Sequence, residues 1–599
     1  METGTIHGNA GAEYAGRLEL LRIEEAKEER RHSQLGIAKI VVVAAVLGLF
    51  AWYVKTRALS IAGLIPLAVL FVALEVAHSS ALRSLARCRG LIGFYERGLA
   101  RLRDDWIGKG EAGQEFLDAE HPYARDVDLF GEGSLFELLC TARTNAGQEL
   151  LAHWLKKPAS LEEIASRQAA VQELRPRLDL RAELAIFGEG VRSQVRVEAL
   201  TGWAEETAEA RLGSMRVLAG ILSAAWICTV VAWAIWGVWE FVVLVGAVNL
   251  VVNSRYKARM AKAIAAEDFE DDLKLLGGVM RLLEVEKFSS AKLMALQGNL
   301  RAEGEPASHA IRRLRRLIEN LESRDNLALR LIDPFILWTA QFAVAIEAWR
   351  RKYGPLLRKW LAAVGEMEAV MSLAGYTYEH PADVFPEFVK GGGPLFEAEG
   401  LAHPLLPGQQ AVRNDLRLGE ALRLMIVSGP NMAGKSTLIR AVGMNAVLAQ
   451  CGAPVRARRL RMSRLQLGAS ICVLDSLQGG VSRFYAEITR LKVIEESTAG
   501  ELPVLFLLDE LLGGTNSNDR RVGAEAVVKS LVAKGAIGLI TTHDLALTLM
   551  AEDMNGRAGN FHFEDRIEDG QLRFDYLLAP GVATGSNALK LMRSIGLEV

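Results

Sequence analysis

The stretch from Leu424 to Gln450 decides the fold of the C-terminal part of the chain: LMIVS (424–428), GPNMAGKST (429–437) and LIRAVGMNAVLAQ (438–450). The first segment is apolar and predicts a buried strand, and the third predicts a helix. The segment between them fits GxxxxGK[ST], a phosphate-binding pattern when it joins a strand to a helix. These residues therefore predict a nucleotide-binding loop in an α/β domain.

The residues of this loop suit phosphate chemistry. Its glycines let backbone N–H groups turn toward phosphate oxygens, and the helix that follows favours negative charge at its N-terminus. Lys435 would neutralise the β- and γ-phosphates as a catalytic cation, and the Ser436 hydroxyl would ligate Mg²⁺. The residues predicted to bind the nucleotide are Gly429, Pro430, Asn431, Met432, Ala433, Gly434, Lys435, Ser436 and Thr437.

Two further apolar runs end in polar residues. VLFLL (504–508) precedes Asp509 and Glu510, and AIGLI (536–540) precedes TTHD, which contains His543. We predict that Asp509 holds the water shell of Mg²⁺ and that Glu510 polarises the attacking water as a general base. His543 would sense the γ-phosphate or that water. The sequence thus predicts an enzyme that binds and hydrolyses ATP with Mg²⁺.

Composition limits the class of protein. The chain has 599 residues with 70 Lys+Arg against 72 Asp+Glu, a formal charge of -2, and half of its residues are hydrophobic. This length suggests about three to five domains, and the near-neutral charge excludes a globally basic nucleic-acid coat. Five scattered cysteines without a CxxC pair argue against a disulfide framework and a structural zinc site, and favour a reducing compartment.

Much of the apolar content lies near the N-terminus. Residues 40–54 and 58–74 contain no charged side chain, and Lys55 and Arg57 lie between them. A helix needs roughly 20 residues to cross the hydrocarbon core, so each run is slightly short alone. We predict a transmembrane hairpin; a buried helical hairpin of a soluble core is the alternative.

A second apolar block covers residues 217–252 and is interrupted only by Glu240. It is long enough to cross a thin membrane twice, and tryptophans gather around Gly237, as is typical of a membrane interface. Basic residues flank the block on both sides, which predicts that both of its ends lie in the cytoplasm.

The rest of the chain before residue 381 predicts helices, and 381–400 predicts a linker. The run IRRLRRL (311–317) is basic and could contact phosphate, although such a run is more often a solvated helix face.

The motifs resemble those of the MutS mismatch-repair ATPases. GPNMAGKST is similar to their phosphate loop, DELLGGTNSND (509–519) to their DE-x-G-R-G-T segment, and GASICVLDSLQGGVSRFYAE (468–487) to their G-A-S-D…S-x-F-x-x-E stretch. Leu512 and Gly513 replace the usual Gly and Arg. Residues 134–174 resemble the start of the family's core domain, and 366–376 its last lever helix.

The resemblance has implications for partners and for further residues. The ATPase would form a homodimer with two composite sites, with Ser482 reaching the partner's γ-phosphate and Asn414 lying near the adenine. Long helical levers would carry ATP-driven motion away from the ATPase. DNA would be the partner, and mismatch repair the family role.

The chain also departs from the mismatch-binding members. Phe94-Tyr95-Glu96 fits their F-x-E wedge string, but it follows the first hairpin, and we predict an amphipathic helix there. The second apolar block stands where the family's clamp would be inserted. An ABC-type transporter is a weaker alternative, because LDSLQGG (474–480) resembles the LSGGQ signature only superficially.

We therefore predict a multidomain chain: an α-helical core and lever domain with transmembrane hairpins, followed by an α/β P-loop NTPase domain of the ABC-ATPase type. Its predicted parts are a cytosolic tail (1–35), hairpin 1 (36–77), the first core part (78–212), hairpin 2 (213–253), the lever (254–385) and the ATPase (386–599). The predicted function is a membrane-anchored, MutS-like ATPase coupled to DNA, in a bacterial-type inner membrane with its ATPase in the cytoplasm. A membrane mechanochemical protein without DNA binding is the alternative.

Overall fold

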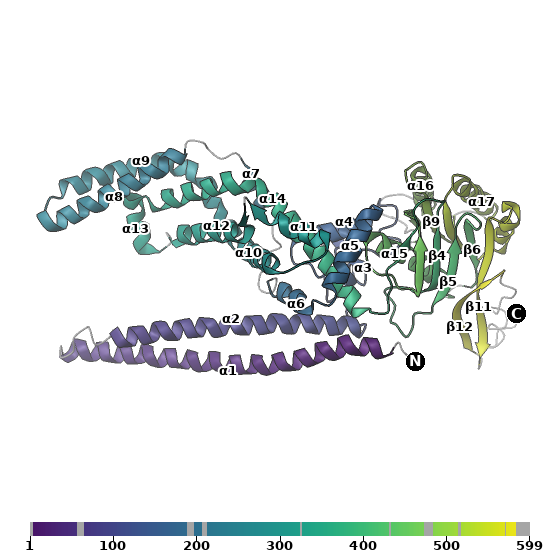
Figure 1. Cartoon of the computed structure of the whole chain (residues 1–599), viewed down its shortest axis with the longest axis horizontal. Helices are drawn as coiled ribbons and strands as arrows, with labels where there is room; N and C mark the ends of the chain where they lie inside the picture. Colours follow the sequence, from purple (N-terminus) through teal and green to yellow (C-terminus); the bar gives the residue numbers. More distant parts are fainter. Residues whose placement is uncertain are drawn as a thin grey trace.

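The chain is elongated, with two helical arms that point toward one end and an α/β region at the other (Figure 1). The computed structural model describes residues 4–56, 65–187, 197–206, 212–302, 304–323, 326–430, 433–471, 483–512, 517–568 and 571–582. The coarse prediction of a largely helical, multidomain chain with a mixed α/β C-terminal region is confirmed.

The first arm is a pair of long helices, α1 (Gly4–Thr56) and α2 (Ile65–Leu102), packed side by side along their length. Both helices continue well beyond the apolar runs, so the predicted boundaries at 36 and 77 fall inside unbroken helices. The polar half of the arm is joined by ion pairs such as Arg22–Glu96 at 2.8 Å and Arg89–Glu25 at 2.8 Å. Buried side chains such as Leu18 and Leu99 continue the packing of the two helices outside the apolar segments, and these ion pairs add to it.

The string Phe94-Tyr95-Glu96 lies in α2 and is part of the base of this arm. Phe94 and Tyr95 are buried against Tyr14, and Glu96 pairs with Arg22. An aromatic ring packed in a core cannot stack on a base, so the amphipathic-helix prediction is confirmed and the wedge reading is excluded for this conformation.

The helical body contains α3 (Leu135–Leu139), α4 (Asn145–Lys156), α5 (Leu161–Leu174), α6 (Leu178–Ile186), α7 (Val197–Glu205), α10 (Glu270–Val285), α11 (Ala291–Asn299), α12 (Ala307–Glu322) and α14 (Trp338–Glu379). Short strands β1 (Arg301–Ala302) and β2 (Glu305–Pro306) pair antiparallel, and 3-10 helices lie at Gln114–Phe116, Ala265–Phe269 and, in the C-terminal region, Leu545–Met554. The long helix α14 packs on α4, α5, α7 and α12, and so forms the spine of this body.

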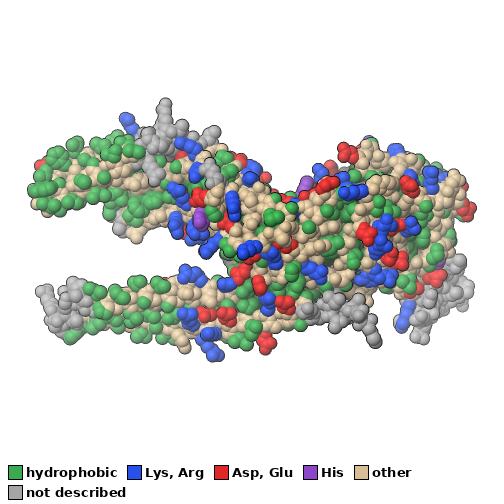
Figure 2. All heavy atoms as spheres, viewed as in Figure 1, with side chains coloured by type: hydrophobic (Ala, Val, Ile, Leu, Met, Phe, Trp, Pro, Cys, Tyr) green, Lys and Arg blue, Asp and Glu red, His purple; other side chains and the backbone are tan. Residues whose placement is uncertain are grey.

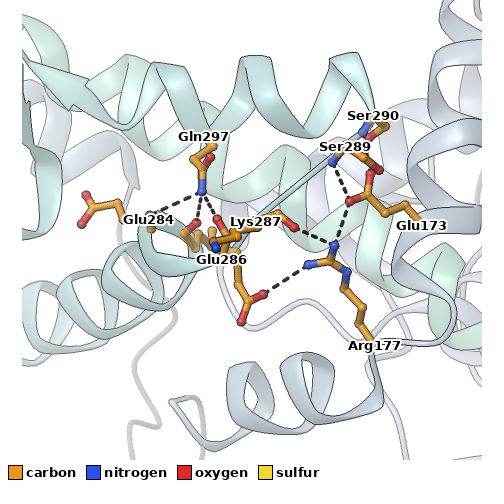
Figure 3. Close-up of polar contacts among 9 residues, drawn as sticks. Glu173, Arg177, Glu284, Glu286, Lys287, Ser289, Ser290 and Gln297 are labelled. Carbon is orange, nitrogen blue, oxygen red and sulfur yellow. Dashed lines mark hydrogen bonds and ion pairs between the residues drawn. The ribbon is translucent and has the colours of Figure 1, made fainter.

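A polar network joins the helices that precede the second arm to those that follow it (Figure 3). Glu173 accepts hydrogen bonds from the backbone N–H groups of Ser289 at 2.8 Å and Ser290 at 2.6 Å. Arg177 donates to Glu173 at 2.9 Å and to Glu286 at 3.2 Å. The two helical segments, far apart in sequence, therefore form one body.

The second arm consists of α8 (Leu212–Trp236) and α9 (Glu240–Ile264), and it turns at Gly237, whose φ of +74° suits glycine. The break therefore falls where the tryptophan cluster predicts it. Helix α13 (Leu327–Ile336) lies across this arm and meets α14 at a bend of 70°.

Three helices of the described part are long and apolar enough to cross a membrane by length and composition: Ala10–Trp52, Ile65–Leu102 and Val217–Trp236. The bent pair α13–α14 raises the number to four if it counts as one span. The side chains of α9 are described without a gap only over 240–255, which is shorter than a full span, so the expected second pass of hairpin 2 stays a prediction.

The C-terminal region contains a six-stranded sheet in the order β12-β11-β6-β10-β9-β8, parallel except for β12. Its strands are β6 (Leu424–Ser428), β8 (Gln466–Ser470), β9 (Val504–Asp509), β10 (Ile537–Thr542), β11 (Ala558–Glu568) and β12 (Gln571–Pro580). Helix α15 (Lys435–Cys451) packs on one face of this sheet, and α16 (Arg483–Ser497) and α17 (Ser517–Ala533) pack on the other. The predicted strands at 424–428, 504–508 and 536–540 and the predicted helix at 438–450 are confirmed.

A smaller sheet lies beside it, in the order β3-β7-β4-β5. Its strands are β3 (Glu387–Phe388), β4 (Phe396–Leu401), β5 (Asn414–Leu418) and β7 (Arg459–Met462). The prediction of a linker over 381–400 is therefore wrong for 387–388 and 396–400. The Gly and Pro residues there mark turns between strands, and alternate side chains of β4 are buried.

Candidate nucleotide site

A cavity of about 930 Å³ opens at the carboxyl ends of β6, β9 and β10. In open parallel sheets this edge is where ligands bind. The cavity is large enough for a nucleotide. The predicted residues that line it are Asn414, Pro430, Gly434, Lys435, Ser436, Thr437, Asp509 and Glu510. The structure thus brings together predicted residues from three separate segments of the chain.

Lys435 is the buried cation of this cavity. Its Nζ donates to the carbonyl oxygens of Gly429 at 2.7 Å and Pro430 at 3.0 Å, and lies 3.9 Å from the Glu510 carboxylate. Burial lowers the pKa of Lys435, and the nearby carboxylates of Glu510 and Asp509 oppose that shift. The ammonium group therefore has weak partners that a phosphate can replace with stronger, charge-assisted hydrogen bonds.

The acidic pair at the end of β9 is held by the neighbouring strand. Thr541 donates its hydroxyl to Asp509 Oδ1, and the Glu510 backbone N–H donates to the Thr541 carbonyl at 3.3 Å. Glu510 has a φ of +47°, a left-handed conformation that aims its side chain differently from Asp509. His543 Nδ1 lies 3.6 Å from Glu510 Oε1. Glu510 is therefore within reach of both Lys435 and His543.

Ser436 and Asp509 supply the oxygen ligands that Mg²⁺ prefers. Among the described residues, no group of three His, Cys, Asp or Glu side chains is placed to hold a metal. A magnesium ion at this position would therefore rely on phosphate oxygens and water for the remaining ligands, as is usual for nucleotide sites. When bound there, it would neutralise the charge that develops on the phosphates.

Asn414 uses its side-chain amide within the protein. It donates to the Tyr576 carbonyl at 3.0 Å and accepts from the Leu578 backbone N–H at 2.7 Å, and so attaches β12 to β5. The structure places it on the cavity wall, and its expected position near adenine stays a prediction. Tyr576 lines the same cavity close to Gly434 and presents an aromatic surface.

Sequence reasoning missed Tyr576 as a site residue. It also left out His403, which lines the cavity and whose pKa is lowered to about 4, mainly by burial. The HPL segment at 403–405 was a usable signal for His403. Tyr576 lies in a β-hairpin with no motif of its own, so only the tertiary structure brings it to the loop.

Several predicted residues are not among those that line the cavity. Gly429 and Ala433 belong to the loop itself, and Gly429 adopts a φ of +146° with its Cα close to the Phe563 backbone. Asn431, Met432 and Ser482 lie outside the described residues. Helix α16 begins just after Ser482, and its Glu487 accepts a hydrogen bond from the Leu512 backbone N–H, which couples α16 to the loop after β9.

Two family models match this chain, one in the α/β region and one in the helical body. The family model "MutS domain V" matches residues 425–598, and "MutS domain III" matches residues 121–205. These two segments therefore carry MutS-family domains. The resemblance inferred from the motifs is confirmed.

Curated relatives match only part of the chain. An Endonuclease MutS2 of Thermus thermophilus is 34% identical over 207 residues, which cover 34% of this chain and 27% of the relative. A DNA mismatch repair protein MutS of Brevibacillus brevis is 30% identical over 280 residues, covering 44% and 32%. The DNA mismatch repair protein MSH6 of Arabidopsis thaliana is 29% identical over 308 residues, covering 48% and 22%. The match thus spans about a third or less of each of these relatives.

Proposed function

We propose that this chain is a Mg²⁺-dependent ATPase of the MutS family, whose nucleotide binds in the cavity between β6, β9 and β10. The observation that carries the proposal is the convergence of Lys435, Ser436, Asp509 and Glu510 on that cavity. Lys435 would hold the phosphates, and Glu510 would take a proton from the attacking water. Tyr576 offers its ring as a surface for the base.

We further propose that the ATPase is anchored in a membrane. The outer halves of the two arms expose large apolar side chains, and both arms point the same way, away from the ATPase (Figure 2). On the first arm these side chains are Ile37, Ile40, Val41, Val43, Leu47, Phe50, Trp52, Ile65, Val69, Leu70, Val72 and Val76. Water would solvate such an apolar surface poorly, whereas the acyl chains of a bilayer would solvate it well. A bacterial-type inner membrane with the ATPase in the cytoplasm fits this arrangement.

The general-base proposal is tested with Glu510→Gln. This variant should bind ATP and hydrolyse it about 100 to 10,000 times more slowly, because the catalytic base is lost. Glu501→Gln is the matched control, since Glu501 is exposed before the other end of β9. Hydrolysis by Glu510→Gln at the control's rate would exclude Glu510 as the base.

The family's role predicts coupling of this ATPase to DNA in a homodimer. Turnover stimulated by duplex DNA should fade as salt rises, because phosphate contacts release counterions. A dimer with composite sites should recover activity when Ser482→Ala is mixed with Lys435→Ala, since one intact site then forms. Absence of recovery would argue for sites within one chain.

A membrane mechanochemical protein without DNA binding is the second candidate. The two apolar arms favour it, since they give the helical body a direct attachment to a bilayer. Lys435-dependent turnover that ignores DNA at every salt concentration would select this candidate.

A further inference from the structure

Helix α13 breaks away from the spine of the molecule and lies across the second arm (Figure 1). The break at Leu337 has a φ of +50°, and α14 continues at 70° to α13. Leu331 is 68% exposed and Ile332 42% exposed, and Arg330 is also exposed. This short helix therefore presents both apolar and basic side chains outward.

The end of α13 is fixed to the arm by polar side chains. Ser223 donates its hydroxyl to the Ile336 carbonyl at 2.6 Å, and Gln341 donates to the same carbonyl at 3.0 Å. Asn249 donates to the Phe335 carbonyl. The last carbonyls of a helix have no partner within it, and in lipid each must find one nearby. The arm thus satisfies the helix end in the way that a membrane setting requires.

The depth of this attachment follows from the helix rise. The apolar segment of α8 starts at Val217, and Ser223 lies six residues further, so the rise between them is about 9 Å. Interfacial helices lie about 5–10 Å into the boundary between headgroups and acyl chains. If Val217 marks the edge of the apolar layer, α13 lies at that boundary.

The helix before α13 carries the basic run of the sequence. In α12, Ile311, Leu314 and Ile318 are buried, and Arg313 and Arg316 are exposed. Lys and Arg side chains gather around this helix, on the side of the helical body that faces the first arm (Figure 2). The C-terminal end of α12 is held close to the α13–α14 junction, since Trp338 donates its indole N–H to the Asn320 carbonyl at 2.8 Å.

We propose that α12 and α13 form a docking face for a leaflet rich in anionic phospholipid. Leu331 and Ile332 lie among the acyl chains, while Arg313, Arg316 and Arg330 meet the headgroup phosphates. This inference rests on the proposed membrane anchoring and adds a contact that no apolar span supplies. Because α14 continues from the docked α13 to the ATPase end of the body, the face attaches the lever to the bilayer surface.

The test places an environment-sensitive NBD fluorophore on one exposed cysteine of the full chain, reconstituted in vesicles, while the buried Cys88, Cys140 and Cys451 are left in place. The sites are native Cys228 on α8, which is exposed, Leu331→Cys, and Leu549→Cys on the ATPase, where the leucine is 62% exposed. Cys472 is changed to Ser in all three variants, and Cys228 in the last two. Quenching by lipids brominated near the headgroup is compared with quenching by lipids brominated deep in the acyl chain.

The docking face predicts that the label at 331 is quenched more by shallow bromines than by deep ones, and that the label at 549 is quenched by neither. Quenching at 228 without quenching at 331 would overturn the docking face and leave the membrane anchoring intact. Absence of quenching at 228 would refute the anchoring itself. A signal at 331 that follows protein concentration in detergent would assign this face to a second copy of the chain.

The charge component has its own readout. A trace of brominated phosphatidylglycerol in phosphatidylcholine should quench the label at 331 more than the same trace of brominated phosphatidylcholine. Each arginine near an anionic surface contributes about 1 kcal/mol, so Arg313→Gln with Arg316→Gln should reduce this preference by up to about 30-fold. Lys492→Gln, an exposed site on α16, is the control. An unchanged preference in the double variant would exclude these arginines as headgroup ligands.

Discussion

The ion pair between Arg101 and Glu379 should hold the first arm onto α14, the spine of the helical body. Arg101 in α2 makes two hydrogen bonds of 2.7 Å to the Glu379 carboxylate at the end of α14. The Glu379 side chain is 1% exposed and that of Arg101 13%. Tyr14 of α1 also donates its hydroxyl to Glu379 at 3.2 Å. One carboxylate therefore joins both helices of the arm to the spine.

Removing one partner of a buried pair leaves the other charge unpaired, which costs about 3–5 kcal/mol. Glu379→Gln or Arg101→Met alone should therefore raise the population of the detached arm at least about 100-fold. The double variant removes both charges and should cost clearly less than the sum of the single effects.

Hydrogen exchange of the polar half of α1, measured by mass spectrometry in detergent, reports this local opening. Arg358→Gln is the control, because its pair with Glu205 is exposed and should contribute less than about 1 kcal/mol. Exchange at wild-type rates in both single variants would refute this account of the joint. Strictly additive single effects would show that the pair itself contributes nothing.

Substitutions at three further positions test other parts of the molecule. Burial raises the pKa of Glu368 to about 7, so the free energy of unfolding falls as pH rises from about 4.5 to about 7. Between pH 5 and pH 8, the free energy of unfolding of Glu368→Gln, measured with denaturant, should rise by up to about 3 kcal/mol relative to that of wild type. If the difference in free energy of unfolding between variant and wild type stayed constant across that range, the raised pKa of Glu368 would be contradicted. Gly434→Ala should weaken nucleotide binding severalfold, because φ is +100° and the new methyl group would lie 3.1 Å from the Tyr576 ring; wild-type affinity would contradict this packing. Tyr576→Ala should lower affinity for ATP about tenfold, whereas Tyr576→Phe should keep it; equal losses in both would point to the hydroxyl instead of the ring.

The nucleotide loop could be predicted from the sequence because its signal is local. A buried strand, a glycine-rich loop and a helix follow one another between Leu424 and Cys451, and each has its own pattern. The acidic end of β9 is equally local. Tyr576 depends on the pairing of β11 and β12 and on the contact of β12 with Asn414, which no short pattern encodes.

The arms show a different limit. Hydropathy located the apolar segments, but it could not show that α1 continues as a helix through the charged residues before Lys39. The ion pairs that stabilise that half join residues more than 60 positions apart. The sequence did not predict the sharp break at Leu337 either, since a leucine rarely adopts a positive φ and neither glycine nor asparagine lies at the turn.

The departure at Leu512 has a structural outcome. This residue, which stands where the family usually has glycine, adopts a φ of +56° and is buried against α17. The strain of that conformation is offset by burial of the leucine side chain, which contributes about 1.5–3 kcal/mol. Position 512 therefore keeps a backbone conformation suited to glycine despite the substitution.

The central claim is that ATP binds in the cavity around Lys435 and is hydrolysed there. The most direct measurement is ATP turnover by the full chain in detergent with Mg²⁺, compared between wild type, Lys435→Ala and the exposed control Lys492→Ala. We expect turnover in wild type and in the control, and its loss in Lys435→Ala, because the phosphates lose their buried cation. Equal turnover in all three proteins would contradict the claim.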